Sequence, residues 1–230
     1  LSAHEASDAR AVERSELAAG ELKQLCVKTQ EGGFDWARRP APPAFQAAVQ
    51  KLGSEQVSGF MADLTDGYRS EICLQLTPWL EALTARRSRG LALFFDYGYP
   101  RGEYYSPERV DGTLRCHYRH HPHADPFLWP GLQDITAHVD FTAVAEAALS
   151  AGLDVAGYTT QAAFLLDCGL EQLLQAVGEP GSATHLKAVQ QVKTLIMPGE
   201  MGERFKYIAL TKGLDDALPG FRMQDMRERL

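Results

Sequence analysis

The fold of this chain is decided by an apolar stretch and the residues that end it, Leu91-Ala92-Leu93-Phe94-Phe95-Asp96-Tyr97-Gly98. Leu91–Phe95 is apolar at every position and follows Gly90, which predicts a strand buried on both faces, as in a parallel α/β sheet. Ligands of open α/β sheets bind beyond the carboxyl ends of the strands, so Asp96 lies where a ligand would be met. Gly98 is expected to let the chain turn sharply and to leave room for that ligand.

Helix and strand signals alternate around this stretch. A helix is predicted from Thr77-Pro78, a hydroxyl N-cap followed by proline, to Gly90. The other predicted helices cover residues 45–52, 141–151, 161–177 and 186–196, and the other predicted strands cover residues 153–160 and 205–212. This order indicates an α/β fold. We expect residues 1–42 to be an irregular remnant or connecting segment, and residues 43–230 to form the α/β domain.

Residues 99–134 contain no periodic segment and are rich in proline, aromatic residues and arginine. A connection of this length without secondary structure is uncommon inside a compact domain and is usually functional. Aromatic and arginine side chains at this density need a surface to pack on. We therefore expect this insertion to form a lid or a protein-docking surface.

Composition excludes several classes of protein. The chain has 230 residues, of which 45% are apolar and 23% charged, as is typical of a globular protein with a full core. A net charge of −7 does not favour a nucleic-acid partner. No apolar run approaches the ~20 residues that cross a bilayer, so no membrane partner is expected.

The four cysteines, Cys26, Cys73, Cys116 and Cys168, form no CxxC pair, which argues against a zinc cage or a thioredoxin-like site. Their even number permits two disulfides. Free thiols are the favoured interpretation in a chain of this length that shows no signal peptide. We accordingly expect a cytoplasmic location.

A histidine cluster lies within Gly112-Thr113-Leu114-Arg115-Cys116-His117-Tyr118-Arg119-His120-His121-Pro122-His123. Imidazole groups suit zinc or iron. However, no pair has i, i+4 spacing on a convincing helix, and the interleaved arginines would repel a cation, so no metal is expected. The histidines either hydrogen-bond to the backbone or recognise a substrate or partner.

A second polar cluster, Asp134, His138 and Asp140, lies just before the helix predicted to begin at Phe141. Asp140 or Thr142 is a candidate N-cap for that helix. A carboxylate and a histidine in this position also suit an acid–base pair. The chain contains no GxSxG nucleophile elbow, no GxGxxG or P-loop glycine motif, and no HExxH.

These motifs occur in a fixed order: Leu93–Gly98, Gly112–Arg115, His120, Gly131–Phe141, Gln161, Phe164–Leu166, Gly169 and Met201–Lys206. The set resembles the MidA family of class I S-adenosylmethionine-dependent methyltransferases, over about residues 70–213. Mitochondrial members of that family are complex I assembly factors that methylate an arginine of a partner subunit. The resemblance implies S-adenosylmethionine as cofactor and a protein as substrate.

The resemblance also implies a Rossmann-like sheet of which this chain holds the C-terminal part. By analogy, the strands over residues 91–95, 153–160 and 205–212 would be its fifth, sixth and seventh, the last of them antiparallel. Family members carry an N-terminal half with a glycine-rich turn and an acid that holds the cofactor ribose, and neither motif is found here. The chain also begins at Leu1 rather than methionine. We expect a piece of a longer polypeptide, which needs that half as a partner and binds the cofactor weakly by itself.

Methyl transfer to arginine requires carboxylates that hold the guanidinium and accept a proton. The acids best placed for this role, judged from position alone, are Asp96, Glu71 and Asp134. Two other classes of function stay open. One is a non-catalytic protein-binding or assembly module, and the other is a metal-dependent hydrolase built on the histidine cluster.

Overall fold

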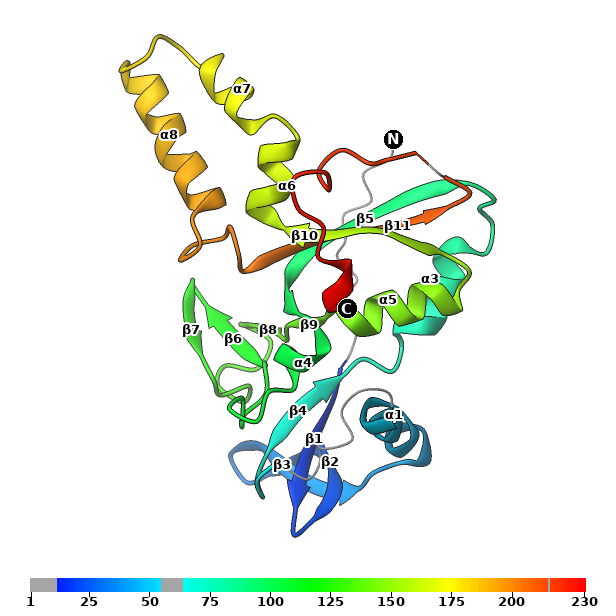
Figure 1. Ribbon diagram of the computed structural model, residues 1–230. Helices are drawn as coiled ribbons and strands as arrows, with labels where there is room; N and C mark the ends of the chain where they lie inside the picture. The colour runs from blue at the N-terminus through cyan, green and yellow to red at the C-terminus, as the bar shows by residue number, and fades with distance from the viewer. Residues whose placement is uncertain (1–11, 55–63, 215) are drawn as a thin grey trace. The chain divides into compact units, whose positions relative to one another are not determined.

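A computed structural model describes residues 12–54, 64–214 and 216–230 of the chain. It contains two compact units (Figure 1). Unit 1 consists of residues 1–76 and 102–138, and unit 2 consists of residues 77–101 and 139–230. Both units combine sheets with helices, which confirms the mixed α/β class.

Unit 1 begins with a four-stranded antiparallel sheet, where the sequence predicts irregular structure. Its strands are β1 (Glu13–Ala18), β2 (Glu21–Gln30), β3 (Gly33–Pro40) and β4 (Arg69–Ile72), in the order β3-β2-β1-β4. Ala19 and Gly20 both have positive φ, 52° and 73°, as the tight turn between β1 and β2 requires. Charged side chains are interspersed along these strands, and Glu16 of β1 is buried beside Arg38 and Arg69, so the strands show no apolar alternation in the sequence. Helix α1 (Pro43–Ser54) supplies Phe45 to the core of this unit.

The insertion also has regular structure, contrary to expectation. It holds the short helix α4 (Arg101–Tyr104) and a three-stranded antiparallel sheet of order β7-β6-β8. The strands are β6 (Arg115–Tyr118), β7 (His121–His123) and β8 (Asp134–Thr136). Strands of three or four residues are too short to show a period in the sequence.

Unit 2 is built on a sheet of order β10-β11-β5-β9. Strands β10 (Asp154–Thr160), β11 (Phe205–Lys212) and β5 (Gly90–Tyr99) pair antiparallel, and β9 (Val139–Asp140) pairs parallel with the end of β5. The antiparallel direction of β11 is as predicted. Burial on both faces is found in β11, where residues 206–211 are all buried. It is not found in β5, whose Leu91, Leu93 and Phe95 are exposed.

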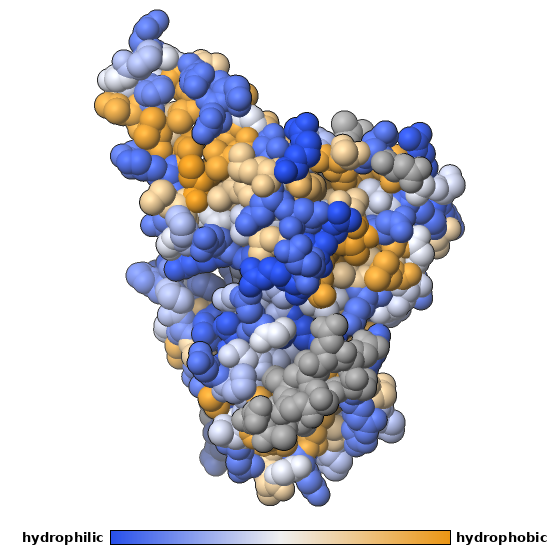
Figure 2. Space-filling view, in the orientation of Figure 1, coloured by the Kyte–Doolittle hydropathy of each residue, from blue (hydrophilic) through white to orange (hydrophobic). Residues whose placement is uncertain are grey.

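The helices of unit 2 are α3 (Leu76–Thr84), α5 (Phe141–Ser150), α6 (Gln161–Asp167), α7 (Leu170–Gln175), α8 (Ala183–Ile196) and the 3-10 turn η1 (Arg227–Arg229). Most begin and end near the predicted residues. However, α3 includes the predicted N-cap Thr77 and ends at Thr84 rather than at Gly90, and η1 was not predicted. The helix expected over residues 161–177 is broken by Gly169, whose φ is +90°. Helices α7 and α8 form an arm with no buried residue, and Figure 2 shows an apolar patch over it.

All four cysteines are free thiols, as predicted. Cys116 is buried and Cys168 is exposed. The search for membrane spans, made over the described residues, found no helix with the length and hydropathy to cross a bilayer.

Candidate active site

Asp96 lies near the C-terminal end of β5 and is accessible to solvent. Its Oδ1 atom accepts a hydrogen bond from the backbone N–H of Tyr97 at 2.8 Å. Desolvation by the surrounding chain raises the pKa of the Asp96 carboxyl, and the Tyr97 N–H opposes that shift. Within the described ranges, no hydrogen-bond donor contacts Oδ2. Asp96 therefore offers a carboxylate oxygen with an increased affinity for a proton.

Gly98 brings the end of β5 against β9. A Cβ atom at this position would lie 2.2 Å from the carbonyl oxygen of Val139 and 2.9 Å from the ring of Phe141. Gly98 also pairs with Val139 in the parallel ladder. The expected sharp turn with room for a ligand is therefore wrong, because the backbone of β9 fills the space that glycine leaves.

Asp140 follows β9 and forms an N-cap for α5, which confirms the structural interpretation of this residue. Its Oδ1 accepts a hydrogen bond from the N–H of Ala143 at 3.0 Å, and its Oδ2 lies 3.7 Å from Nε of Arg101. Desolvation raises the pKa of Asp140 to about 6, although the Arg101 guanidinium opposes the shift. Arg101 in turn forms two hydrogen bonds with Glu146, at 2.5 and 2.7 Å. This half-buried group ties Arg101 to α5 within unit 2.

Glu71 lies on β4 in unit 1 and is 1% exposed. Its Oε2 atom accepts hydrogen bonds from the backbone N–H of Thr113 at 2.8 Å and from the Thr113 hydroxyl at 3.0 Å. Its Oε1 atom lies 3.5 Å from Nε of Arg14. Gly112, with φ of +69°, leaves no room for a Cβ, which would lie 2.6 Å from Oε1. Glu71 thus anchors the Gly112–Arg115 motif to β4, and its carboxylate is directed into the protein.

Thr113 joins this motif to the polar cluster before α5. Its hydroxyl lies 3.2 Å from that of Tyr104 and accepts a hydrogen bond from the backbone N–H of His138 at 3.1 Å. The pKa of His138 is lowered to about 4, first by desolvation and then by the charges of Arg109 and Arg115. His138 is accordingly neutral at pH 7. Thr113 was not predicted as a site residue, since a lone threonine has no diagnostic spacing in the sequence.

The structure places the three predicted acids in different surroundings. Asp134 lies exposed on β8, opposite His117 in the ladder with β6. Glu71 is in the same unit but is buried against Thr113 and Arg14. Asp96 belongs to unit 2. Asp96 is exposed to solvent, and desolvation raises the pKa of its carboxyl.

The histidine cluster forms the β6–β7 hairpin. Its turn residues Arg119 and His120 have φ of 49° and 66°, and the Tyr118 ring packs on Trp129 with centroids 4.4 Å apart. Among the residues that the structure describes, no group of three or more histidine, cysteine or acidic side chains is placed to hold a metal ion. The hairpin therefore has the form of an aromatic and basic surface.

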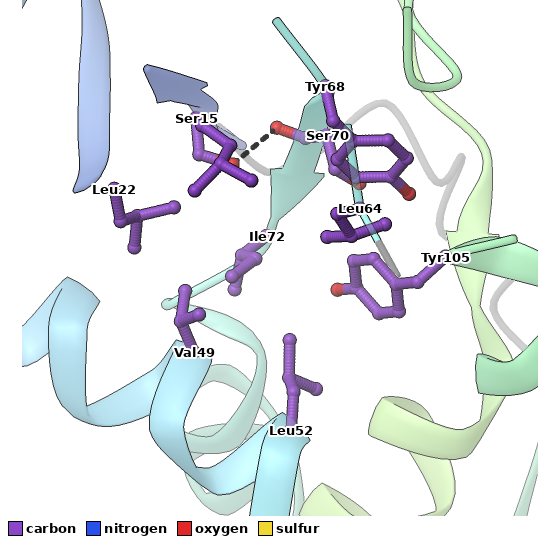
Figure 3. A pocket seen from close by; sticks show the side chains of 10 residues that line it. Ser15, Leu22, Val49, Leu52, Leu64, Tyr68, Ser70, Ile72 and Tyr105 are labelled. Atoms are coloured by element: carbon purple, nitrogen blue, oxygen red, sulfur yellow. Dashed lines mark hydrogen bonds between the residues drawn. The ribbon is translucent and has the colours of Figure 1, made fainter. Parts of the chain in front are cut away.

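Two pockets among the described residues lie in unit 1. One lies between α1 and the four-stranded sheet and has a volume of about 30 Å³, the share of a single water molecule in the liquid (Figure 3). The other is open and polar, with a volume of about 440 Å³, and its lining includes Arg109 and Arg115. The first is too small for S-adenosylmethionine. The second is lined by the acids Glu108 and Asp111 as well as by the two arginines, so its charged side chains balance. The smaller one is lined by Ser15, Leu17, Leu22, Val49, Leu52, Leu64, Tyr68, Ser70, Ile72 and Tyr105.

Comparison with known proteins gives several relatives. The chain is 29% identical over 219 residues to a protein named "Protein arginine methyltransferase NDUFAF7 homolog, mitochondrial" from Drosophila melanogaster. That alignment covers 92% of this chain and 47% of the fly protein. The mouse protein arginine methyltransferase NDUFAF7 is 33% identical over 146 residues, an alignment that covers 61% of this chain and 31% of the mouse protein.

A solved structure from Burkholderia thailandensis, with S-adenosyl-homocysteine bound, is 40% identical. Its TM-score to this chain is 0.85, and the match covers 95% of this chain and 55% of the solved one. This chain thus spans about half the length of the fly relative and of the solved structure.

A family model described as "Putative S-adenosyl-L-methionine-dependent methyltransferase" matches residues 1–159. This match agrees with the motif order over residues 70–213 and with the relatives above. The chain belongs to this family of S-adenosyl-L-methionine-dependent methyltransferases, as its motifs predict.

Proposed function

We propose that this chain is the C-terminal part of an enzyme that transfers a methyl group from S-adenosylmethionine to an arginine side chain of a partner protein. The observation that carries the proposal is the likeness to an arginine methyltransferase homologue along 92% of the chain. The relative that binds S-adenosyl-homocysteine, matched along 95% of the chain, supports the cofactor. The strand order β10-β11-β5, with β11 antiparallel, is compatible with a Rossmann-like class I sheet.

In this proposal, Asp96 is the group that meets the acceptor. An arginine guanidinium is protonated at neutral pH, so it must be held by a carboxylate and must release a proton as its new N–C bond forms. The Oδ2 atom of Asp96 is accessible, and desolvation raises the pKa of the carboxyl, which favours proton acceptance. When bound, S-adenosylmethionine supplies the methyl group as a sulfonium.

The other two acids receive different roles in the proposal. Glu71 is a positioning residue, because it holds Thr113 and through it the segment that contains His138. Asp134 is exposed on the insertion and is proposed to contact the partner protein. The insertion serves as the surface that receives this partner, and its exposed Trp129 and Arg119 have the composition of interface contacts.

Radiolabelled methyl transfer tests this function. The purified gene product that contains this chain is incubated with methyl-labelled cofactor and a total-protein extract, and labelled amino acids are identified after hydrolysis. We expect methylarginine, and we expect Asp96→Asn to lower the rate by about 10²-fold with an unchanged melting temperature. Asp154→Asn, an exposed acid at the start of β10, is the matched control and should keep the full rate. Label on a different amino acid, or a destabilised but active Asp96→Asn, contradicts the proposal.

A second candidate, a non-catalytic binding module, is favoured by the exposed aromatic and basic side chains of the insertion, Trp129 and Arg119. The same assay separates the two functions, because a binding module retains a partner protein from the extract without labelling it. The cytoplasmic location stays a prediction, and the curated relatives named above are mitochondrial by name.

A further inference from the structure

The arm of unit 2 is a helical hairpin in which α7 and α8 lie side by side (Figure 1). The loop between the helices turns at Gly178 and Gly181, whose φ angles are 65° and 85°. Ser182 then caps α8, because its hydroxyl accepts a hydrogen bond from the N–H of His185 at 3.2 Å. Nδ1 of His185 lies 3.2 Å from the carbonyl oxygen of Val177, which ties the start of α8 back to the end of α7. The tip of the arm is therefore an ordered connection between two antiparallel helices.

The base of the arm is anchored to the rest of unit 2. Gln161 of α6 is 3% exposed, and its Nε2 donates a hydrogen bond to the carbonyl oxygen of Leu195 at 2.9 Å. Gly202 lies so close to the end of α8 that a Cβ there would be 2.1 Å from the carbonyl oxygen of Ile196. The backbone N–H of Ala162 donates to the carbonyl oxygen of Gly202 at 3.0 Å. These contacts hold the arm at α6, so the surface that it presents is a fixed one.

The arm has more apolar side chains than its two helices can cover. Neither α7 nor α8 contains a buried residue. Leu173 and Leu186 are 66% and 55% exposed, and Met197, directly after α8, is 49% exposed. Figure 2 shows the apolar side chains gathered over the arm. Helices in proteins gain most of their stability from packing an apolar face, so an arm of this kind is typical of an interface. Six further apolar residues of the arm are only partly buried, Leu170, Leu174, Val177, Val189, Val192 and Ile196.

Charge is divided between the two sides of the arm. Residues 170–182 include Glu171 and Glu179 but no lysine or arginine, whereas α8 carries Lys187 and Lys193 but no acid. All four charged side chains are exposed. A partner of a single charge sign would be attracted by one side of the arm and repelled by the other. A second copy related by a twofold axis can place its acidic side against the basic helix and its basic helix against the acidic side.

We infer that the arm is a homodimer interface, in which the α7 side of one copy packs against α8 of the other. Two helical hairpins packed in this way form a four-helix arrangement, which covers the apolar side chains that one hairpin leaves exposed. The twofold axis makes the opposite charges meet twice. The inference goes beyond methyl transfer, and it holds whatever group the enzyme methylates.

The mass of the protein in solution tests the inference. The purified gene product that contains this chain is measured by analytical ultracentrifugation over a dilution series. We expect twice the mass of one polypeptide. Leu173→Glu/Leu186→Glu should raise the dissociation constant of the dimer at least about 100-fold, as the loss of two apolar anchors does. Leu149→Glu changes a leucine that is 61% exposed on α5, outside the arm, and is the matched control that should stay dimeric.

Reversal of charge tests which side of the arm meets which. In one variant, Lys187→Glu/Lys193→Glu makes the arm acidic, and in another, Glu171→Lys/Glu179→Lys makes it basic. Each variant alone should be monomeric, because like charges would then meet at both contacts. An equimolar mixture of the two should form a 1:1 heterodimer, since every contact is again between opposite charges. Formation of this heterodimer also shows that both variants are folded.

The outcomes that overturn the inference are distinct. A monomeric wild type overturns it, and so does a dimer that Leu173→Glu/Leu186→Glu leaves intact. Homodimers of both charge variants that are as stable as the wild type would refute the pairing of α7 with α8. A monomeric wild type that binds phospholipid vesicles through the arm would assign the surface to a membrane instead. Methyl transfer by a monomer would refute the dimer and leave the proposed function standing, whereas a dimer without methyl transfer would do the reverse.

Discussion

Replacing Glu71 by glutamine tests whether this residue stabilises the fold or takes part in catalysis. Glu71 is 1% exposed, and its Oε2 accepts two hydrogen bonds from Thr113, at 2.8 and 3.0 Å. Its Oε1 faces the Nε of Arg14 at 3.5 Å. Glutamine keeps the volume of the side chain but removes the charge that all three contacts use.

The size of the effect follows from these contacts. Hydrogen bonds to a charged acceptor contribute about twice as much as neutral ones, so each bond from Thr113 should lose about 1 kcal/mol. Arg14 would face an amide in place of a carboxylate, at a further cost of about 1 kcal/mol. We therefore expect the free energy of unfolding to fall by about 3 kcal/mol, the lower end of the range for breaking a buried ion pair.

Urea unfolding followed by tryptophan fluorescence measures this change. A double-mutant cycle with Thr113→Val should give a coupling energy of about 1–2 kcal/mol, because the two side chains are in direct contact. The exposed Asp154→Asn serves as the control and should stay within about 0.5 kcal/mol of the wild type. A Glu71→Gln variant of unchanged stability that has lost methyl transfer would show that Glu71 meets the acceptor, and would refute its positioning role.

Three further predictions concern the junction of β5 and α5 and the residues beside it. Gly98→Ala should lower the free energy of unfolding by about 2–3 kcal/mol, because its Cβ would meet the backbone carbonyl of Val139 at 2.2 Å. Gly102→Ala, whose Cβ has open space, is the control and should leave the free energy of unfolding unchanged. Thermal melting of both variants measures the difference. The pKa of Asp140 is about 6 in the folded protein against an ordinary 3.8, so its contribution to stability should fall by roughly 3 kcal/mol as the pH rises through that window. The difference in urea midpoint between wild type and Asp140→Asn should therefore change between pH 3.8 and pH 6. A difference that stays constant over this range would contradict the claim that burial raises the pKa of Asp140. The pKa of His138 is about 4 against 6.5, so wild-type stability should fall as the pH drops through that range, and the same titration of His138→Asn should show a weaker dependence.

Features set by neighbours in sequence were predictable. The N-cap at Asp140 and the start of α5 follow from a short polar side chain placed before a helical run, a signal contained in four residues. The break at Gly169 was missed, although its cause is equally local, because apolar spacing continues through it. The sheet over residues 13–40 was missed because its buried positions do not alternate and include the charged Glu16, which is paired with arginines distant in sequence.

The candidate site was predictable in part. Asp96 follows an apolar run, and the end of a strand is a sound place to expect a functional side chain. The surroundings of Glu71 could not be predicted, since its partners Thr113 and Arg14 are distant in sequence. Burial of a carboxylate depends on the groups that fold around it, and a single sequence does not show which these are.

The sequence by itself determined the α/β composition, the N-cap of α5 and the membership of a methyltransferase family, because each rests on local pattern or on motif order. Only the tertiary structure decided which strand is central. Both β5 and β11 are rich in apolar residues, yet residues 206–211 of β11 are buried between β10 and β5, whereas Leu91, Leu93 and Phe95 of β5 are exposed. Burial is a property of what lies on either side of a strand, and chain segments far away in sequence supply those neighbours.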